Sequence, residues 1–300
     1  MIDISDIRKG IMSNIVAIVT DSCASIPEAL ISELNIHQVA YYIHRGQEVL
    51  RDLVTIQRDE FLRWLPSART LPTTASPGPG DYLTVYESLE RQGVKEVVSL
   101  HMTSKGSGAF QAAKAAQSIA QESLPGLRIE VIDTLNVSLC QGWMVIEAAR
   151  SALRGQSLET ICAQVRRLIP ITHMFQTADT LKYLYMGGRI GQATHLLGSL
   201  LNIKPLIGME DGEIVALGKA RSTQRIYQMM VERIERAVGR MGKIKVAFVH
   251  AGAPDEIMKL KSLVESRLEC VESLVAELSP ALAVHSGPGT TGLCYFPIHD

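Results

Sequence analysis

Three segments of the sequence combine hydroxyl side chains with glycines, and two of them also carry a basic residue or a histidine. The first runs from Ser99 to Gln111 and reads SLHMTSKGSGAFQ, with Ser107 between Gly106 and Gly108. A strand, a loop and a helix that begins near Ser107 would place free backbone N–H groups beside a hydroxyl, which suits an anion. Ser107 would then donate to a carboxylate or a phosphate; alternatively, it only caps the helix. This segment alone leaves both interpretations open.

The second segment, Pro72 to Gly80, carries hydroxyls at Thr73 and Thr74. Its prolines and glycines predict a shaped loop. In an ordinary turn such hydroxyls bond their own backbone, so a structural role is the alternative to ligand binding.

The third segment, His285 to Gly292, has the spacing GxGxxG but does not read as a dinucleotide motif. Pro288 lies inside the spacing, and the residues that follow are too few for the helix of a βαβ unit. The segment predicts a turn that displays His285 and Ser286 beside backbone amides. A histidine there can hydrogen bond an anion, although a structural histidine is the alternative.

Basic residues occur at two further places. Arg189 follows the helix stop Gly187-Gly188, and arginine suits bidentate contact with a carboxylate or phosphate, with a surface salt bridge as the alternative. A basic cluster at the predicted start of a helix is either a solvated face or a docking patch for an acidic partner. It consists of Lys219, Arg221 and Arg225.

Several function classes are disfavoured. Ser107 lacks the GxSxG spacing of a nucleophile elbow, and neither HExxH nor a Walker A loop occurs. The 30 Lys and Arg against 31 Asp and Glu argue against a nucleic-acid-binding protein. The N-terminal stretch lacks the apolar core of a signal peptide, and no apolar run predicts a transmembrane helix.

The cysteines predict no disulfide framework and no metal site, and they favour a reducing cytoplasm; they are Cys23, Cys140, Cys162, Cys270 and Cys294.

The elements that must position these residues predict an α/β fold. Strands at 15–20, 97–100 and 128–132 alternate with helices, which indicates βαβ units and a parallel sheet. The second half predicts a smaller mixed sheet with helices on one side, including a hairpin across Glu210-Asp211-Gly212. We therefore expect an N-terminal extension (1–14), an α/β/α domain (15–168) and a C-terminal α/β domain (169–300) whose final strands are placed to contact the first domain.

Taken in chain order, these segments resemble the DegV family of fatty-acid-binding proteins. The resemblance is carried by VAIVTDS at 16–22, TTASP at 73–77, residues 104–111, VIDT at 131–134, GRI at 188–190, LLGSLLNIKP at 196–205 and HSGPG at 285–289. Each motif alone is weak, whereas the ordered set spans nearly the whole chain.

The resemblance implies a parallel α/β/α domain, a mixed α/β domain and a slot between them that buries an acyl chain. It implies that hydroxyls and a histidine hold the carboxylate, namely Thr73, Thr74, Ser107, His285 and Ser286. It places Arg189 and Arg221 near the head group or facing a kinase, because some members present their fatty acid to a separate kinase that makes acyl phosphate for phospholipid synthesis.

The resulting expectation is a non-catalytic cytoplasmic carrier of a long-chain fatty acid, with no cofactor, no metal, no nucleic-acid partner and at most transient membrane contact. Two alternatives stay open at this point. One is a hydrolase or acyltransferase that uses Ser107 with His285, and the other is a phosphate- or sugar-binding α/β module with a polar pocket.

Overall fold

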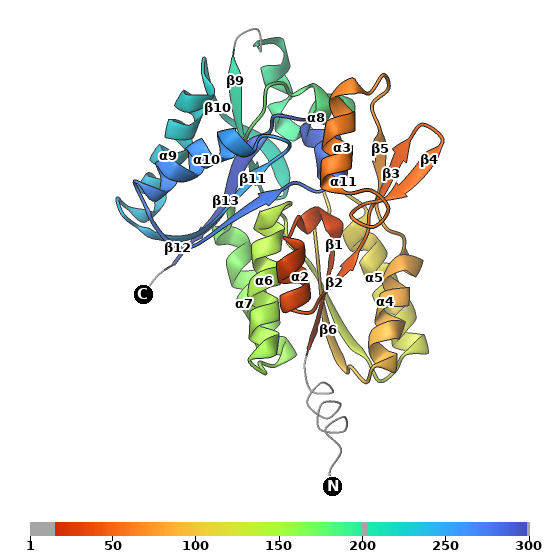
Figure 1. The fold of residues 1–300 in the computed structure, drawn as a ribbon. Helices are drawn as coiled ribbons and strands as arrows, with labels where there is room; N and C mark the ends of the chain where they lie inside the picture. Colours follow the sequence, from red (N-terminus) through yellow and green to blue (C-terminus); the bar gives the residue numbers. More distant parts are fainter. Residues whose placement is uncertain (1–15, 200–202, 299–300) are drawn as a thin grey trace.

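The computed structural model describes residues 16–199 and 203–298, so the predicted extension at 1–14 and part of the LLGSLLNIKP motif lie outside the described residues. Figure 1 shows a lower part built around a parallel sheet and an upper part built around a second sheet. The lower sheet has the order β2-β1-β6-β7. Its strands are β1 (Ala17–Asp21), β2 (Ile36–Val39), β6 (Glu96–His101) and β7 (Arg128–Asp133).

Helices cover both faces of this sheet, so its strands are buried on both sides, as is usual for parallel sheets. On one face lie α4 (Pro79–Arg91) and α5 (Ala109–Ser123), and α5 turns a row of fully buried alanines inward (Ala113, Ala116, Ala120). Such small side chains let the helix approach the strands closely. On the other face lie α6 (Leu139–Leu153) and α7 (Leu158–Leu168), with α2 (Glu28–Glu33) beside them.

A small antiparallel sheet interrupts the first half of the chain. It has the order β4-β3-β5, and helix α3 (Arg58–Trp64) follows its hairpin. The strands are β3 (Tyr42–Arg45), β4 (Glu48–Arg51) and β5 (Thr73–Ala75). The expected loop at 72–80 is therefore partly wrong, because Thr73–Ala75 pairs with β3 as an added strand.

The upper sheet is mixed and has the order β10-β9-β8-β13-β11-β12, in which only β11 and β12 are parallel. The strands are β8 (His173–Thr177), β9 (Lys204–Glu210), β10 (Glu213–Ala220), β11 (Lys243–His250), β12 (Glu269–Glu277) and β13 (Thr291–Pro297). The predicted hairpin across residues 210–212 is confirmed. Asp211 and Gly212 both have positive φ, as a two-residue turn of this kind requires.

The remaining helices flank the upper sheet. Its outer face is covered by α9 (Thr223–Val238) and α10 (Pro254–Glu265), whereas α8 (Lys182–Met186) and α11 (Pro280–Ser286) lie against one another near the first half. The expected turn at His285 and Ser286 is wrong in one respect, since both residues belong to the last turn of α11. Gly287 ends that helix with a φ of 78°.

Helix α6 joins the two large sheets. Trp143 on α6 is fully buried, packs edge-on against Phe296 of β13 and donates from Nε1 to the Cys294 carbonyl at 3.3 Å. One hydrophobic core therefore continues from the lower sheet through α6 into the upper sheet.

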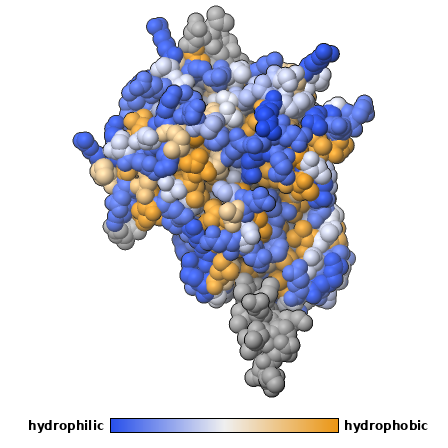
Figure 2. Space-filling model, viewed as in Figure 1, coloured by the Kyte–Doolittle hydropathy of each residue, from blue (hydrophilic) through white to orange (hydrophobic). Residues whose placement is uncertain are grey.

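On the face drawn in Figure 2, hydrophilic side chains cover much of the surface and hydrophobic ones are scattered among them. Within residues 16–199 and 203–298, no helix is both long and apolar enough to cross a membrane. In the same ranges, no three His, Cys, Asp or Glu side chains gather as a metal site would require.

Candidate functional site

A cavity of about 810 Å³ lies where the lower sheet meets the upper one. The segments that follow β1 and β6 form one wall, which is where ligands bind in open α/β sheets. Strands β8 and β9 and helices α8 and α11 supply the facing wall. The apolar residues that line the cavity, taken over both walls, are Cys23, Met102, Val137, Met174, Leu184, Met209, Ile214, Leu278, Ala281 and Leu282.

Ser107 forms one polar corner of this cavity, just before α5. Its Oγ lies 2.6 Å from the hydroxyl of Tyr41 and accepts from the Ala109 backbone N–H at 3.2 Å. Burial raises the pKa of the Tyr41 phenol well above its usual range, so the phenol keeps its proton. The N-cap of α5 is Gly108 and not Ser107, and Ser107 lies just before it as a cavity-lining hydroxyl that accepts from the first N–H of the helix.

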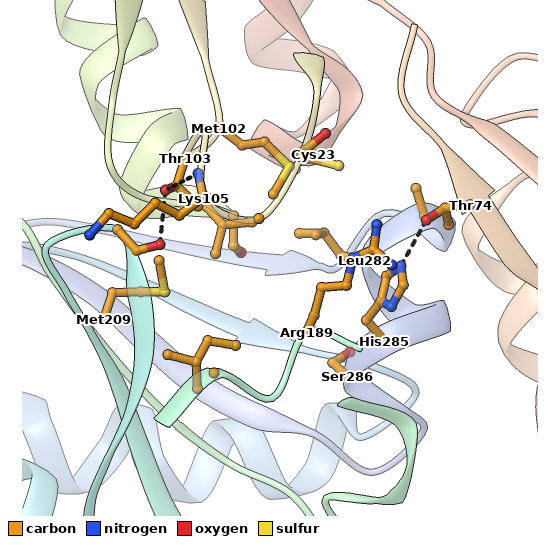
Figure 3. A pocket seen from close by; sticks show the side chains of 18 of the residues that line it. Cys23, Thr74, Met102, Thr103, Lys105, Arg189, Met209, Leu282, His285 and Ser286 are labelled. Carbon is orange, nitrogen blue, oxygen red and sulfur yellow. Dashed lines mark hydrogen bonds between the residues drawn. The ribbon is translucent and has the colours of Figure 1, made fainter. Parts of the chain in front are cut away.

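Thr74 and His285 form a second polar pair. Thr74 Oγ1 lies 2.7 Å from His285 Nε2, and Figure 3 shows the two side chains pointing toward one another. Strand β5 brings Thr74 here, and the last turn of α11 brings His285. A Cβ at Gly108 would lie 3.2 Å from Ser76 Oγ, so the start of α5 and the end of β5 are neighbours.

Arg189 extends beside His285 in Figure 3. Burial, with a smaller contribution from the Arg189 charge, lowers the pKa of His285 to about 4, so its imidazole is neutral at physiological pH. Gly187 leaves room for this ring, because a Cβ there would lie 2.2 Å from His285 Nδ1.

The middle of the cavity is apolar. Figure 3 shows Cys23, Met102 and Leu282 between the Thr74–His285 pair and the opposite side, where Thr103, Lys105 and Met209 lie. Burial raises the pKa of the Cys23 thiol well above its usual range, which makes it an apolar wall group and not a nucleophile.

A buried carboxylate fixes the loops that carry this wall. Asp21 Oδ1 accepts from the Cys23 backbone N–H at 3.1 Å, and Oδ2 accepts from the Met102 N–H at 3.2 Å. His101 Nδ1 lies 3.1 Å from the same Oδ2, and its Nε2 lies 2.7 Å from Ser99 Oγ. The side chains of Asp21, His101 and Ser99 are fully buried and do not line the cavity, so this network supports the cavity wall from behind.

The β9–β10 hairpin closes the opposite side of the cavity. Thr103 Oγ1 donates to the Gly212 carbonyl at 2.8 Å, and Lys105 Nζ lies 3.8 Å from Glu213. A Cβ at Gly212 would lie 2.5 Å from Thr103 Oγ1, so this close approach requires glycine.

The structure brings five of the seven sequence-predicted site residues to the cavity: Thr74, Ser107, Arg189, His285 and Ser286. Ser286 lines it, but its Oγ is buried and has no hydrogen-bond partner among the described residues. Thr73 is exposed on β5 and Arg221 is exposed before α9, and neither lines the cavity.

Sequence reasoning missed Tyr41 and the wall residues Met102, Met174 and Met209. Tyr41 lies next to Tyr42, just before a strand, and nothing in its local pattern indicates that it meets Ser107, 66 positions away. The methionines are scattered along three strands or strand ends, so no spacing signals a shared wall.

Ser107 and His285 do not form a nucleophile–base pair. Each has another partner, Tyr41 and Thr74 respectively, and the described residues contain no hydrogen bond between the two. Ser–His catalysis would require that bond.

Comparison with known proteins agrees with the fold. A family model described as "Uncharacterised protein, DegV family" matches residues 15–298. A DegV domain-containing protein of Caldanaerobacter subterraneus is 30% identical over 280 residues, covering 93% of this chain and 98% of that protein. A DegV domain-containing protein of Deinococcus radiodurans is 31% identical and covers 94% of this chain and 99% of that protein.

Solved structures give the same result. A Thermus thermophilus DegV family protein, described by its fatty acid binding, has a TM-score of 0.87 and 33% identity, covering 95% of this chain and 100% of that one. A stearic-acid-binding protein from Eubacterium ventriosum has a TM-score of 0.85 and 26% identity, covering 94% and 98%. DegV from Bacillus subtilis, described as a fatty acid binding protein, has a TM-score of 0.83 and 26% identity, covering 95% and 99%.

Proposed function

The chain belongs to the DegV family, and on that premise we propose that it is a carrier that binds a long-chain fatty acid in its cavity. The observation that carries the proposal is one cavity with an apolar wall and two hydroxyls, each within hydrogen-bond distance of a second polar side chain. Similar structures described as fatty acid binding support it.

Ser107 is the first proposed carboxylate ligand. Its oxygen accepts from the Ala109 N–H, and a proton donated by the neutral Tyr41 phenol would occupy its second lone pair. The Ser107 O–H would then be free to donate to the carboxylate. A hydrogen bond to an ionised acceptor is stronger than a neutral one, which makes this arrangement favourable for a carboxylate.

Thr74 is the second proposed ligand, and His285 prepares it in the same way. If the neutral imidazole carries its proton on Nε2, it donates to Thr74 Oγ1, and the Thr74 O–H points onward to the ligand. The carboxylate would thus be held by two hydroxyls, with the cation of Arg189 nearby, without a fully buried ion pair.

The acyl chain would lie along the apolar wall toward Met102 and Met209. Burying each CH₂ group is worth about 0.8 kcal/mol, so the chain supplies most of the affinity and the polar corner fixes the orientation. Methionine side chains are flexible, which lets such a wall adjust to chains of different shape. This apolar wall favours a lipid over a phosphate or sugar.

We further propose that the protein presents its bound fatty acid to a fatty acid kinase. The residues proposed to face such a partner are Lys219, Arg221 and Arg225, which are all exposed around the start of α9. Arg225 already pairs with Glu232 at 2.6 Å, so Arg221 and Lys219 are the better candidates for contact. The carrier itself would catalyse no step.

Titration of delipidated protein with a fluorescent long-chain fatty acid tests this assignment. The double variant Thr74→Val/Ser107→Ala should bind at least roughly tenfold more weakly, because it removes both proposed donors to an ionised group. The matched control Thr84→Val/Ser118→Ala changes the same residue types at exposed helix positions and should bind like the wild type. Equal affinity of the two double variants would place the carboxylate elsewhere.

A further inference from the structure

Asp52 is a carboxylate with no exposed surface, and it does not itself line the cavity. It follows β4 and lies beneath α11, the helix that carries His285. Burying a carboxylate is unfavourable unless hydrogen bonds or a counter-charge compensate it, so its partners reveal what it holds in place.

Those partners belong to the segment that carries Tyr41 and to helix α11, which carries His285. The Asp52 backbone N–H donates to the Tyr41 carbonyl at 2.9 Å, and Tyr41 is the partner of Ser107. Asp52 Oδ1 accepts from the Ala281 backbone N–H at 3.1 Å, in the first turn of α11. One residue therefore joins the segment that carries Tyr41 to the helix that carries His285.

The geometry of α11 makes this connection direct. Ala281 and His285 are four residues apart in a helix, so they lie one above the other on the same face. Helix α11 also packs against β3 and β5, and β5 carries Thr74. A displacement of the first turn of α11 would therefore change the distance between Thr74 and His285.

We infer that Asp52 is a positioning residue for the fatty-acid carboxylate: its buried side chain anchors the first turn of α11 and so sets the Thr74–His285 pair, while its backbone N–H holds the segment that carries Tyr41. The inference rests on the proposed function and names a residue that would control its affinity from outside the cavity.

Because the charge of Asp52 changes with pH, the proposed role predicts that fatty-acid affinity changes with pH. Burial raises its pKa to about 6, against the lowering effects of the nearby Ser22 hydroxyl, the Ala281 N–H, the Ser279 hydroxyl and the Arg58 charge. Its carboxyl is therefore ionised at pH 8 and largely protonated at pH 5. Protonation replaces a charge-assisted hydrogen bond to Ala281 with a weaker neutral one.

Arg58 and Cys23 are the ionisable side chains that interact electrostatically with Asp52. Arg58 of α3 donates to the carbonyls of Glu277 and Ile26, and the Cys23 thiol has a raised pKa. Glu28 and Glu277 act through Arg58. His285 has a pKa of about 4 and stays neutral throughout this range.

Affinity for a fluorescent long-chain fatty acid, measured at pH 8 and pH 5.5, tests the inference. Asp52→Ala should bind roughly tenfold more weakly at pH 8. Asp52→Asn keeps an acceptor for Ala281, so it should bind better than the alanine variant. It should also lose the part of the pH dependence that Asp52 contributes, whereas any part from the ligand's own carboxyl remains. The control Asp59→Asn removes an exposed carboxylate nearby and should match the wild type.

Wild-type affinity in both Asp52 variants, or an unchanged pH dependence in Asp52→Asn, would overturn the inference and leave the proposed function standing. If the variants fail to fold, the Ala281 amide of the wild type is followed by ¹⁵N NMR. A chemical-shift midpoint near pH 6 supports the anchor, and a flat profile from pH 5 to 8 overturns it. Absence of binding by the wild type at pH 8 would instead overturn the proposed function itself.

Discussion

In the proposed site, Ser107 and Thr74 would be the two donors to the carboxylate of the ligand. Each hydroxyl lies against a second polar group, Tyr41 or His285, that can fill its acceptor site from the protein side. The proton of each hydroxyl would then be directed toward the ligand. These partners come from positions 66 and 211 residues away along the chain, so the sequence could predict the hydroxyls but not what lies behind them.

His285 should make the stability of the delipidated protein depend on pH. Its folded pKa of about 4 lies below the ordinary value of 6.5, so the unfolded chain binds the proton first as the pH falls. The stabilising contribution is complete above pH 6.5 and is lost toward pH 4. Between pH 7.5 and pH 5 it should fall by about 2 kcal/mol.

Urea unfolding of wild type and His285→Gln at those two pH values measures this contribution. The difference in the free energy of unfolding between the two proteins should shrink as the pH falls. The exposed His195→Gln serves as the control. A difference that stays constant, or grows toward pH 5, would contradict a buried neutral imidazole.

At the scale of elements, strands with continuous apolar runs and the hairpin at 210–212 could be predicted because local pattern and turn chemistry decide them. Strand β5 could not, since its three residues, Thr73–Ala75, are held by pairing with β3 and have no apolar pattern of their own. Helix α11 is only seven residues long and leads into glycines and a proline, so its last turn read as a loop. The structure therefore places His285 and Ser286 at the end of a helix, whereas the sequence predicted a turn.

The contact between α8 and α11 depends on Gly187 at the end of α8. Its φ of −77° suits alanine, so Gly187→Ala should disturb the site through its Cβ, which would lie 2.2 Å from His285 Nδ1. We expect roughly tenfold weaker fatty-acid binding, because His285 must move away from Thr74. Gly80→Ala, where a Cβ meets nothing within 4 Å, is the control for fluorescence titration. Unchanged affinity of Gly187→Ala would show that the position of His285 does not matter for binding.

At the scale of the whole molecule, the core runs without interruption between the two sheets. Ile18, Trp143, Met174, Val249 and Phe296 belong to one cluster of buried side chains. The division into 15–168 and 169–300 stays a prediction, and we propose that it describes the two sheets and not two independent folding units.

Differential scanning calorimetry of the delipidated chain tests this coupling. We expect one transition whose calorimetric and van't Hoff enthalpies agree, because neither sheet can lose its side of the shared core alone. Two resolved transitions would mean that the sheets unfold separately and that Trp143 contributes little to their coupling.

Native mass spectrometry of the protein purified from cells under mild conditions tests the central claim most directly. The account predicts an excess mass equal to one long-chain fatty acid, released on denaturation and identified after extraction. The Thr74→Val/Ser107→Ala protein should carry less of it. A wild-type mass that equals the bare chain, with no fatty acid taken up on incubation, would contradict the account.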